Sequence, residues 1–257
     1  MMIEVIDLYK SFRESEVLKG IDFLVERGEI LALVGRSGYG KSVILKHVVG
    51  LLKGDRGKVL IDGEDISISR GRGLERLRRK FGFLFQGGAL FDSMNVFENI
   101  AFPLREKTKL SKEKISDRVL LELKLVDLAG VENKFPAELS GGMKKRVALA
   151  RCLAMDPEIM LFDEPTTGLD PITAHAINRL IMDTHERLKF TGIIITHEVY
   201  QVMNMVQKIA LLNNGKIEAM GTPAEMKVSD NSLMRQFISG SIVPDNTFEK
   251  GRSHETV

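Results

Sequence analysis

The chain has 257 residues, with 37 lysines and arginines against 35 aspartates and glutamates and a formal net charge of +2. This balance excludes a global attraction to nucleic acid, and 44% hydrophobic residues suffice for one large domain or one domain with an insertion. The single cysteine, Cys152, excludes an intrachain disulfide. No apolar run approaches about 18 residues, and the first residues lack a basic segment with an apolar core, so we expect neither a transmembrane helix nor a signal peptide.

Two short strands are predicted first, over residues 3–8 and 17–25, with Phe12 in the turn between them. They indicate a small antiparallel edge ahead of a buried apolar strand at residues 29–34. Phe12 is a candidate to stack on a purine base, although spacing alone favours a packing role, because aromatic rings are mostly core material.

A phosphate-binding pattern follows that strand directly. Residues 35–42 match G-x-x-x-x-G-K-[ST] and precede an apolar helix at residues 43–49, which is the context the pattern requires. The glycines turn backbone N–H groups toward a β-phosphate, and the helix N-terminus adds partial positive charge. Lys41 is expected to reach the β- and γ-phosphates and the Ser42 hydroxyl to ligate Mg²⁺. The predicted nucleotide-binding residues here are Gly35, Arg36, Ser37, Gly38, Tyr39, Gly40, Lys41, Ser42 and Val43.

Residues 58–61 predict a further strand, and residues 70–80 carry a cluster of cations. We interpret the cluster as a solvated helix face, with contact to an acidic partner or an anionic lipid surface as the alternative. Residues 81–85 predict a buried strand, and Gln86 follows it where α/β proteins place ligands. Gly87 and Gly88 give the backbone after it the freedom that a hinge needs.

Residues 87–156 lack strand patterns and predict a helical insertion, with helices at about 95–104, from Ser111 onward, and at 140–155. The third helix begins at Leu139-Ser140-Gly141-Gly142-Met143, where Ser140 is the expected N-cap. Its glycines expose N–H groups at the positive helix end, a second potential anion site, although such a cap alone is commonly structural.

The apolar strand at residues 158–164 ends in Asp163 and Glu164. In P-loop proteins this aspartate holds Mg²⁺. Glu164 faces the other way along the pleat or lies just beyond the strand, which makes it a candidate to polarise an attacking water. The loop after it ends in Gly168-Leu169-Asp170, and a helix is expected from Ile172 to Phe190.

His197 ends the next buried strand, at residues 193–196, and is placed to donate to a γ-phosphate or to the attacking water. A hairpin is predicted around Asn213-Asn214-Gly215, and Thr222 begins a capped helix. Residues 241–257 form a polar C-terminal tail that we expect to be disordered or docked on a partner.

Together these patterns predict an α/β fold: a P-loop NTPase (RecA-like) core with an N-terminal antiparallel β edge and a helical insertion. The order and spacing of seven motifs over residues 3–240 resemble the nucleotide-binding subunit of an ATP-binding cassette (ABC) transporter, which makes residues 1–240 its nucleotide-binding domain. By this resemblance, residues 35–42 match the Walker A segment and residues 139–142 the signature. The five remaining motifs are Gln86 (Q-loop), Asp163 with Glu164 (Walker B aspartate and catalytic glutamate), residues 168–170 (D-loop), His197 (switch histidine) and Phe12 (adenine-stacking aromatic). Two residues depart from the family pattern: Met143, where Gln is commonest, and Tyr39, where a small residue is usual.

The resemblance implies an ATPase that uses ATP and Mg²⁺ and works as a head-to-tail dimer of two copies. Its catalytic residues would be Glu164, His197 and Lys41. Ser140, Gly141, Gly142 and Asp170 would contact the nucleotide across the dimer. Mg²⁺ would lie on Ser42, with Gln86 joining it and Asp163 holding it indirectly.

A narrower resemblance links residues 85–94, 99–106 and 142–146 to the ATPases of Mla-type lipid transporters. It implies a membrane permease and an MCE-domain substrate-binding protein as partners, no nucleic acid, and a cytoplasmic location on the inner face of the cell membrane. Two alternatives remain: an ATPase serving another importer or exporter, for amino acids, metals or lipoproteins, and an ABC ATPase of DNA repair or translation. One cassette, one cysteine and no long heptad run disfavour the second.

Overall fold

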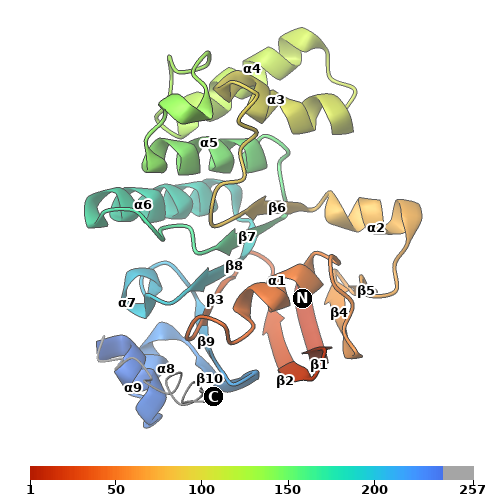
Figure 1. Ribbon diagram of the computed structural model, residues 1–257, viewed down its shortest axis with the longest axis vertical. Coiled ribbons are helices and arrows are strands. Elements are labelled where there is room, and N and C mark those ends of the chain that lie inside the picture. The colour runs from red at the N-terminus through yellow and green to blue at the C-terminus, as the bar shows by residue number, and fades with distance from the viewer. Residues whose placement is uncertain (240–257) are drawn as a thin grey trace, which may run out of the picture.

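The computed structural model describes residues 1–239, and its centre is a six-stranded sheet in the order β10-β9-β3-β8-β7-β6 (Figure 1). Neighbouring strands from β9 to β6 are parallel, whereas β10 is antiparallel to β9. The strands are β3 (Ile30–Val34), β6 (Phe81–Leu84), β7 (Ile159–Asp163), β8 (Thr191–Thr196), β9 (Lys208–Asn213) and β10 (Lys216–Gly221). This mixed α/β architecture confirms the predicted fold class.

The central strands are buried on both faces, as a parallel sheet requires. Along β3, Ile30, Ala32 and Val34 enter one hydrophobic cluster. The alternating residues Leu31 and Leu33 enter the other. The two faces of the sheet therefore support two separate cores.

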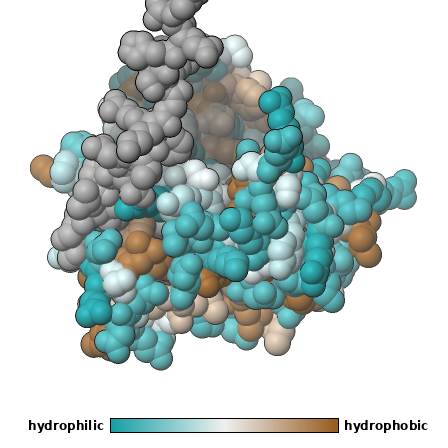
Figure 2. Space-filling model, turned by 60° about the horizontal axis from the view of Figure 1, so that its bottom comes forward, coloured by the Kyte–Doolittle hydropathy of each residue, from teal (hydrophilic) through white to brown (hydrophobic). Residues whose placement is uncertain are grey.

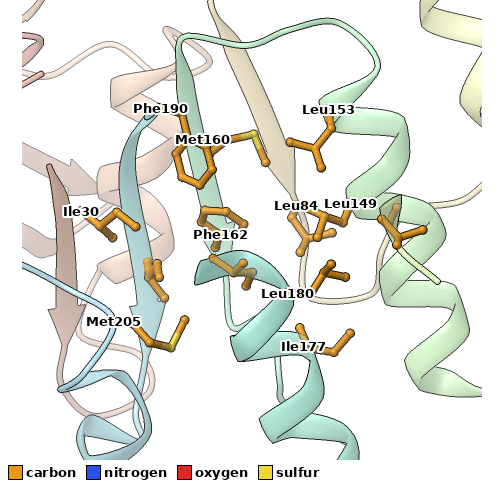
Figure 3. Packing of buried hydrophobic residues seen from close by; sticks show 14 of the residues in the cluster. Ile30, Leu84, Leu149, Leu153, Met160, Phe162, Ile177, Leu180, Phe190 and Met205 are labelled. Atoms are coloured by element: carbon orange, nitrogen blue, oxygen red, sulfur yellow. The ribbon is translucent and has the colours of Figure 1, made fainter. Parts of the chain in front are cut away.

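One core lies between the six-stranded sheet and helices α5 (Gly141–Leu153) and α6 (Pro171–Leu188). Figure 3 shows Leu149 and Leu153 of α5 and Ile177 and Leu180 of α6 in one cluster with the strand residues Leu84, Met160 and Phe162. This packing fixes α5 and α6 against the sheet.

The other core lies between the six-stranded sheet, helix α1 (Lys41–Val48) and a second, antiparallel sheet. The second sheet has the order β2-β1-β4-β5 and confirms the predicted antiparallel edge. Its strands are β1 (Ile3–Phe12), β2 (Ser15–Val25), β4 (Arg56–Ile61) and β5 (Glu64–Asp65).

Between β6 and β7, every residue is described and none forms a strand. The segment contains α3 (Val96–Lys107), α4 (Lys112–Leu125), the short 3₁₀ helix η1 (Pro136–Glu138) and α5, at the top of Figure 1. The Ser111 and Ser140 hydroxyls accept hydrogen bonds from the N–H groups of Lys114 and Met143, so both predicted N-caps are confirmed.

Two expectations for residues 70–85 were wrong in part. Strand β6 ends at Leu84 and is the last strand of its sheet, so Phe85 lies beyond it and is 42% exposed instead of buried. Helix α2 (Gly71–Arg78) is not a uniformly solvated cationic face. Arg78 donates to the carbonyls of Val49 and Gly50, and Lys80 pairs with Asp62 at 2.9 Å.

The C-terminal part begins with the predicted hairpin, in which Asn214 and Gly215 have φ values of 45° and 80° and join β9 to β10. The short helices α7 (Val199–Val202), α8 (Pro223–Lys227) and α9 (Ser232–Ser239) complete the described chain.

The uncovered part of the face in Figure 2 is mostly hydrophilic, with small separate hydrophobic groups. The predicted tail, residues 241–257, lies outside the described residues. Among residues 1–239, no helix combines the length and apolarity needed to cross a lipid bilayer.

Candidate nucleotide-binding and catalytic site

The register of three parallel strands brings the predicted site residues to one edge of the sheet. Val34 of β3 pairs with Thr196 of β8, and Asp163 of β7 pairs with Ile195 of β8. The residues that follow, Gly35, Glu164 and His197, therefore leave the sheet side by side. This is the carboxyl edge, where open α/β sheets bind ligands.

The loop from Gly35 to Gly40 joins β3 to α1 and requires glycine at its first position. Gly35 has φ 153°, and a Cβ there would lie 2.3 Å from the Leu212 carbonyl oxygen. Lys41, 5% exposed, donates from Nζ to the carbonyls of Gly35 at 2.5 Å and Arg36 at 2.8 Å. Burial lowers the pKa of Lys41, and the nearby carboxylates of Glu164 and Asp163 oppose that shift. The ammonium therefore lies beneath the loop, within the space that phosphates enter in this motif.

The side chain of Asp163 faces helix α1, because alternate residues of β7 point to the same side of the sheet. Ile159 and Leu161 share this side with Asp163, and they belong to the same hydrophobic cluster as Ile44 of α1. The Ser42 hydroxyl at the start of α1 donates to Asp163 Oδ1 at 3.1 Å. Burial raises the pKa of Asp163, and the Ser42 hydrogen bond opposes this. A hydroxyl and a carboxylate oxygen are donors of the kind Mg²⁺ accepts, so this pair fits the expected cation.

Glu164 lies just beyond β7 and has a left-handed backbone, with φ 48°. Its carboxylate accepts from Thr167 Oγ1 at 2.8 Å and lies 3.5 Å from both His197 Nδ1 and Gln86 Nε2. Three segments thus converge on one carboxylate whose side chain is 15% exposed.

A cavity of about 260 Å³ lies beside the loop, and both Glu164 and Phe12 line it. Phe12 ends β1, is 42% exposed, and has Lys10 Nζ 5.5 Å from its ring centroid. The ring is thus available to a flat ligand group in the cavity. Tyr39 instead packs, partly buried, against the core beneath α1. The cavity is lined by Phe12, Val17, Ser37, Gly38, Gly40, Lys41, Ser42, Val43 and Glu164.

The predicted signature residues lie apart from this cluster. Ser140 caps α5, and Asp170 caps α6 by accepting from the N–H groups of Ile172 and Thr173 at 3.1 and 3.0 Å. A Cβ on Gly142 would lie 2.5 Å from Thr173 Cγ2, so glycine is needed where α5 approaches α6. The signature and the D-loop therefore lie against each other.

Two residues of the site escaped the sequence analysis. Thr167 holds the Glu164 carboxylate, as described. Lys145 of α5, 6% exposed, donates to the Gln86 carbonyl and to the Glu164 carbonyl at 3.4 Å. Helical spacing in the sequence could have identified Lys145 as a buried residue. It lies on the same buried face of α5 as Gly142 and Leu149.

A glycine-rich loop with a buried lysine, a strand-end carboxylate on its serine and a second carboxylate facing a histidine define a nucleoside-triphosphate-binding P-loop protein. The family model described as "ABC transporter" matches residues 18–167, and the chain belongs to this family. As an ATP-binding cassette, it hydrolyses ATP.

Relatives and a solved structure agree with this placement. The chain is 44% identical to a probable ribonucleotide transport ATP-binding protein, mkl, of Mycobacterium leprae, over 93% of this chain and 69% of that protein. It is 38% identical to the intermembrane phospholipid transport system ATP-binding protein MlaF of Haemophilus influenzae, over 93% of this chain and 90% of MlaF. A dimeric post-hydrolysis structure of the ATP-binding cassette MJ0796 with ADP and phosphate superposes with a TM-score of 0.79 and 31% identity, covering 86% of this chain and 99% of that one.

Proposed function

We propose that this chain is the ATPase subunit that powers lipid transport, with phospholipid as the substrate, through a separate membrane permease. The observation that carries the proposal is the similarity to MlaF, which spans nearly the whole of both chains. The substrate contacts the permease and an MCE-domain substrate-binding protein, and the ATPase lies peripherally on the cytoplasmic face of the membrane.

Within one subunit, the loop N–H groups and Lys41 bind the β- and γ-phosphates, and Phe12 stacks on the adenine. Glu164 orients the attacking water and accepts its proton, because its carboxylate is fixed by Thr167 at 2.8 Å and faces the cavity. His197, 3.5 Å from that carboxylate, links the water to the γ-phosphate. Ser42 and Gln86 would hold Mg²⁺, with Asp163 holding it indirectly, and the bound ion would neutralise phosphate charge.

The second half of the site comes from another copy of the chain, in a head-to-tail dimer. Ser140, Gly141 and Gly142 begin a 13-residue helix, whose N-terminus stabilises negative charge. Within their own subunit the two glycines pack on Leu169 of the D-loop and on Thr173 of α6. We assign the three residues to a γ-phosphate held by the partner, with Asp170 beside them.

The permease docks on the segment that follows Gln86. Phe85 and Phe91, on either side of Gln86, are each 42% exposed and are the side chains that we assign to this contact. The fully buried Asn99 orders the loop after Phe91. Its Nδ2 contacts the carbonyls of Phe91, Met94 and Asn95 at 3.0–3.1 Å, and its Oδ1 accepts from the Phe91 N–H at 2.9 Å.

A second candidate is an ABC ATPase that serves a transporter of another substrate. The observation that favours it is the 44% identity to mkl, whose name refers to ribonucleotide transport. The residue roles above are the same in both cases, so the two candidates differ only in the partner subunits.

The test is mass spectrometry of what co-purifies with tagged protein from gently solubilised membranes. A small multi-spanning permease, an MCE-domain protein and bound phospholipid are expected. A different permease with a binding protein for a soluble substrate would contradict the lipid assignment and leave the ATPase mechanism intact. Absence of any membrane partner would contradict the transport role.

A further inference from the structure

Helix α5 holds the main chain of the segment from Phe83 to Ala89, which contains the Q-loop. Cys152 Sγ donates to the Phe83 carbonyl at 3.2 Å, and Lys145 Nζ donates to the Gln86 carbonyl. The Arg151 guanidinium donates to the carbonyls of Gly88 and Ala89, both at 2.9 Å. Side chains of α5 thus donate hydrogen bonds to four main-chain carbonyls of this segment.

Lys145 differs from the other two donors because it also contacts the catalytic loop. Its ammonium lies 3.4 Å from the carbonyl oxygen of Glu164, which otherwise accepts from the Thr167 N–H at 3.3 Å. Burial lowers the pKa of Lys145, and the charges of Asp163 and Glu164 oppose this. A single buried cation on α5 therefore contacts the main chain of both Gln86 and Glu164.

The contact at Glu164 matters because of its backbone. Glu164 has φ 48°, a conformation that non-glycine residues adopt only when the surroundings hold them in it. The angles φ and ψ set the direction of its carbonyl, and φ also sets the direction in which the side chain leaves Cα. A donor on the carbonyl therefore helps to hold the backbone from which the carboxylate that faces His197 and Gln86 projects.

We propose that Lys145 is a positioning residue that couples α5 and the Q-loop to the catalytic glutamate. A movement of α5 that displaces the ammonium moves the Gln86 main chain and the Glu164 main chain together. The carboxylate thus reaches its working orientation only when the helix that carries the signature is in place. This inference rests on the proposed catalytic role of Glu164.

The experiment compares Lys145→Met with Lys145→Arg in the full chain and uses Lys144→Met as the matched control on the same helix. Steady-state ATP hydrolysis gives kcat and KM, and a fluorescent ATP analogue gives the dissociation constant. For Lys145→Met we expect kcat to fall at least about tenfold, since small misplacements of a catalytic group have effects of this size. The dissociation constant should change less than about threefold, because Lys145 contacts none of the phosphate-binding groups. Lys145→Arg, which keeps a charged donor, should recover most of the loss, and Lys144→Met should leave kcat unchanged.

Wild-type kcat in Lys145→Met would overturn the proposal, and so would parallel losses of kcat and nucleotide affinity, which indicate a binding or packing role. Lys145→Leu also removes every side-chain donor and serves as the second variant if the methionine variant does not fold; full activity in it would also overturn the proposal. Glu164→Gln, assayed beside these variants, separates the two assignments. If Glu164→Gln is active, the catalytic role of Glu164 fails; if it is inactive while Lys145→Met is active, only the coupling role fails.

Discussion

The edge of the parallel sheet and the N-terminal end of α5 are built in opposite ways. At the sheet edge, side chains from different segments contact one another: Ser42 with Asp163, and Thr167, His197 and Gln86 around Glu164. At the end of α5, Ser140 bonds to its own helix and the two glycines pack on the D-loop and its helix.

The difference fits the proposed division of the site between two chains. The sheet edge holds the residues to which we assign the base, its orienting groups and the phosphate-binding loop. The end of α5 offers a helix N-terminus whose two glycines approach Leu169 and Thr173 of the same chain. The following predictions test that division, from the largest expected effect to the smallest.

Replacing Glu164 by Gln should lower kcat by about 10²–10³-fold, because a general base is lost while the shape is kept. ATP binding should survive, so dimers should accumulate in size-exclusion chromatography with ATP. The matched control is Glu158→Gln, a carboxylate just before the opposite end of β7, which should hydrolyse ATP normally. Turnover of Glu164→Gln at the native rate would remove Glu164 from the mechanism.

Replacing His197 by Ala should lower kcat by about 10-fold to 10²-fold with little change in nucleotide affinity, because its ring faces the Glu164 carboxylate and is not part of the cavity lining beside the loop. His175→Ala, on α6, is the control and should keep its activity. Equal kcat in the two variants would show that the contact at 3.5 Å has no catalytic role.

Mixing two inactive variants distinguishes one-chain from two-chain sites. Lys41→Met removes the phosphate-binding lysine, and Ser140→Arg blocks the end of α5. If each site combines the loop of one copy with the α5 end of the other, a mixed dimer contains one intact site. An equimolar mixture should then recover about a quarter of the wild-type rate, since half of the dimers are mixed. Sites contained in single chains would give no recovery.

Replacing Asp163 by Asn should stabilise the nucleotide-free protein while weakening Mg-ATP binding. Burial raises the pKa of Asp163, so folding favours the protonated carboxyl group. The stability that this gives is lost as pH rises through that pKa, and the charged form is unfavourable at neutral pH. Asn removes that cost and can still accept from Ser42. We expect a melting temperature about 2–4 °C higher at pH 7 and a smaller gain at acidic pH, where Asp163 is protonated. Exposed Asp117→Asn is the control, and a lower melting temperature for Asp163→Asn at pH 7 would contradict this account.

The sequence predicted the parts of the site that are local in the chain. Residues 35–42, the strand ending in Asp163 and Glu164, and the strand ending before His197 each carry their own pattern, and parallel register then brings them together. Lys145 and Thr167 carry no such pattern. Their partners lie on other segments or depend on the loop after β7, so only the packed chain reveals them. The prediction that Phe85 is buried was wrong for a similar reason. The position of β6 at the edge of the sheet follows from the order of the strands, which the local sequence does not reveal.

The hydrogen bonds of the buried Asn99 have a consequence for docking. They connect Asn99 to the loop from Phe91 to Asn95 within one chain. That loop therefore loses its conformational freedom when the chain folds and not when a partner binds. A permease that docks here as we propose would therefore meet an ordered surface between Phe91 and α3, and ordering that loop would not reduce its affinity.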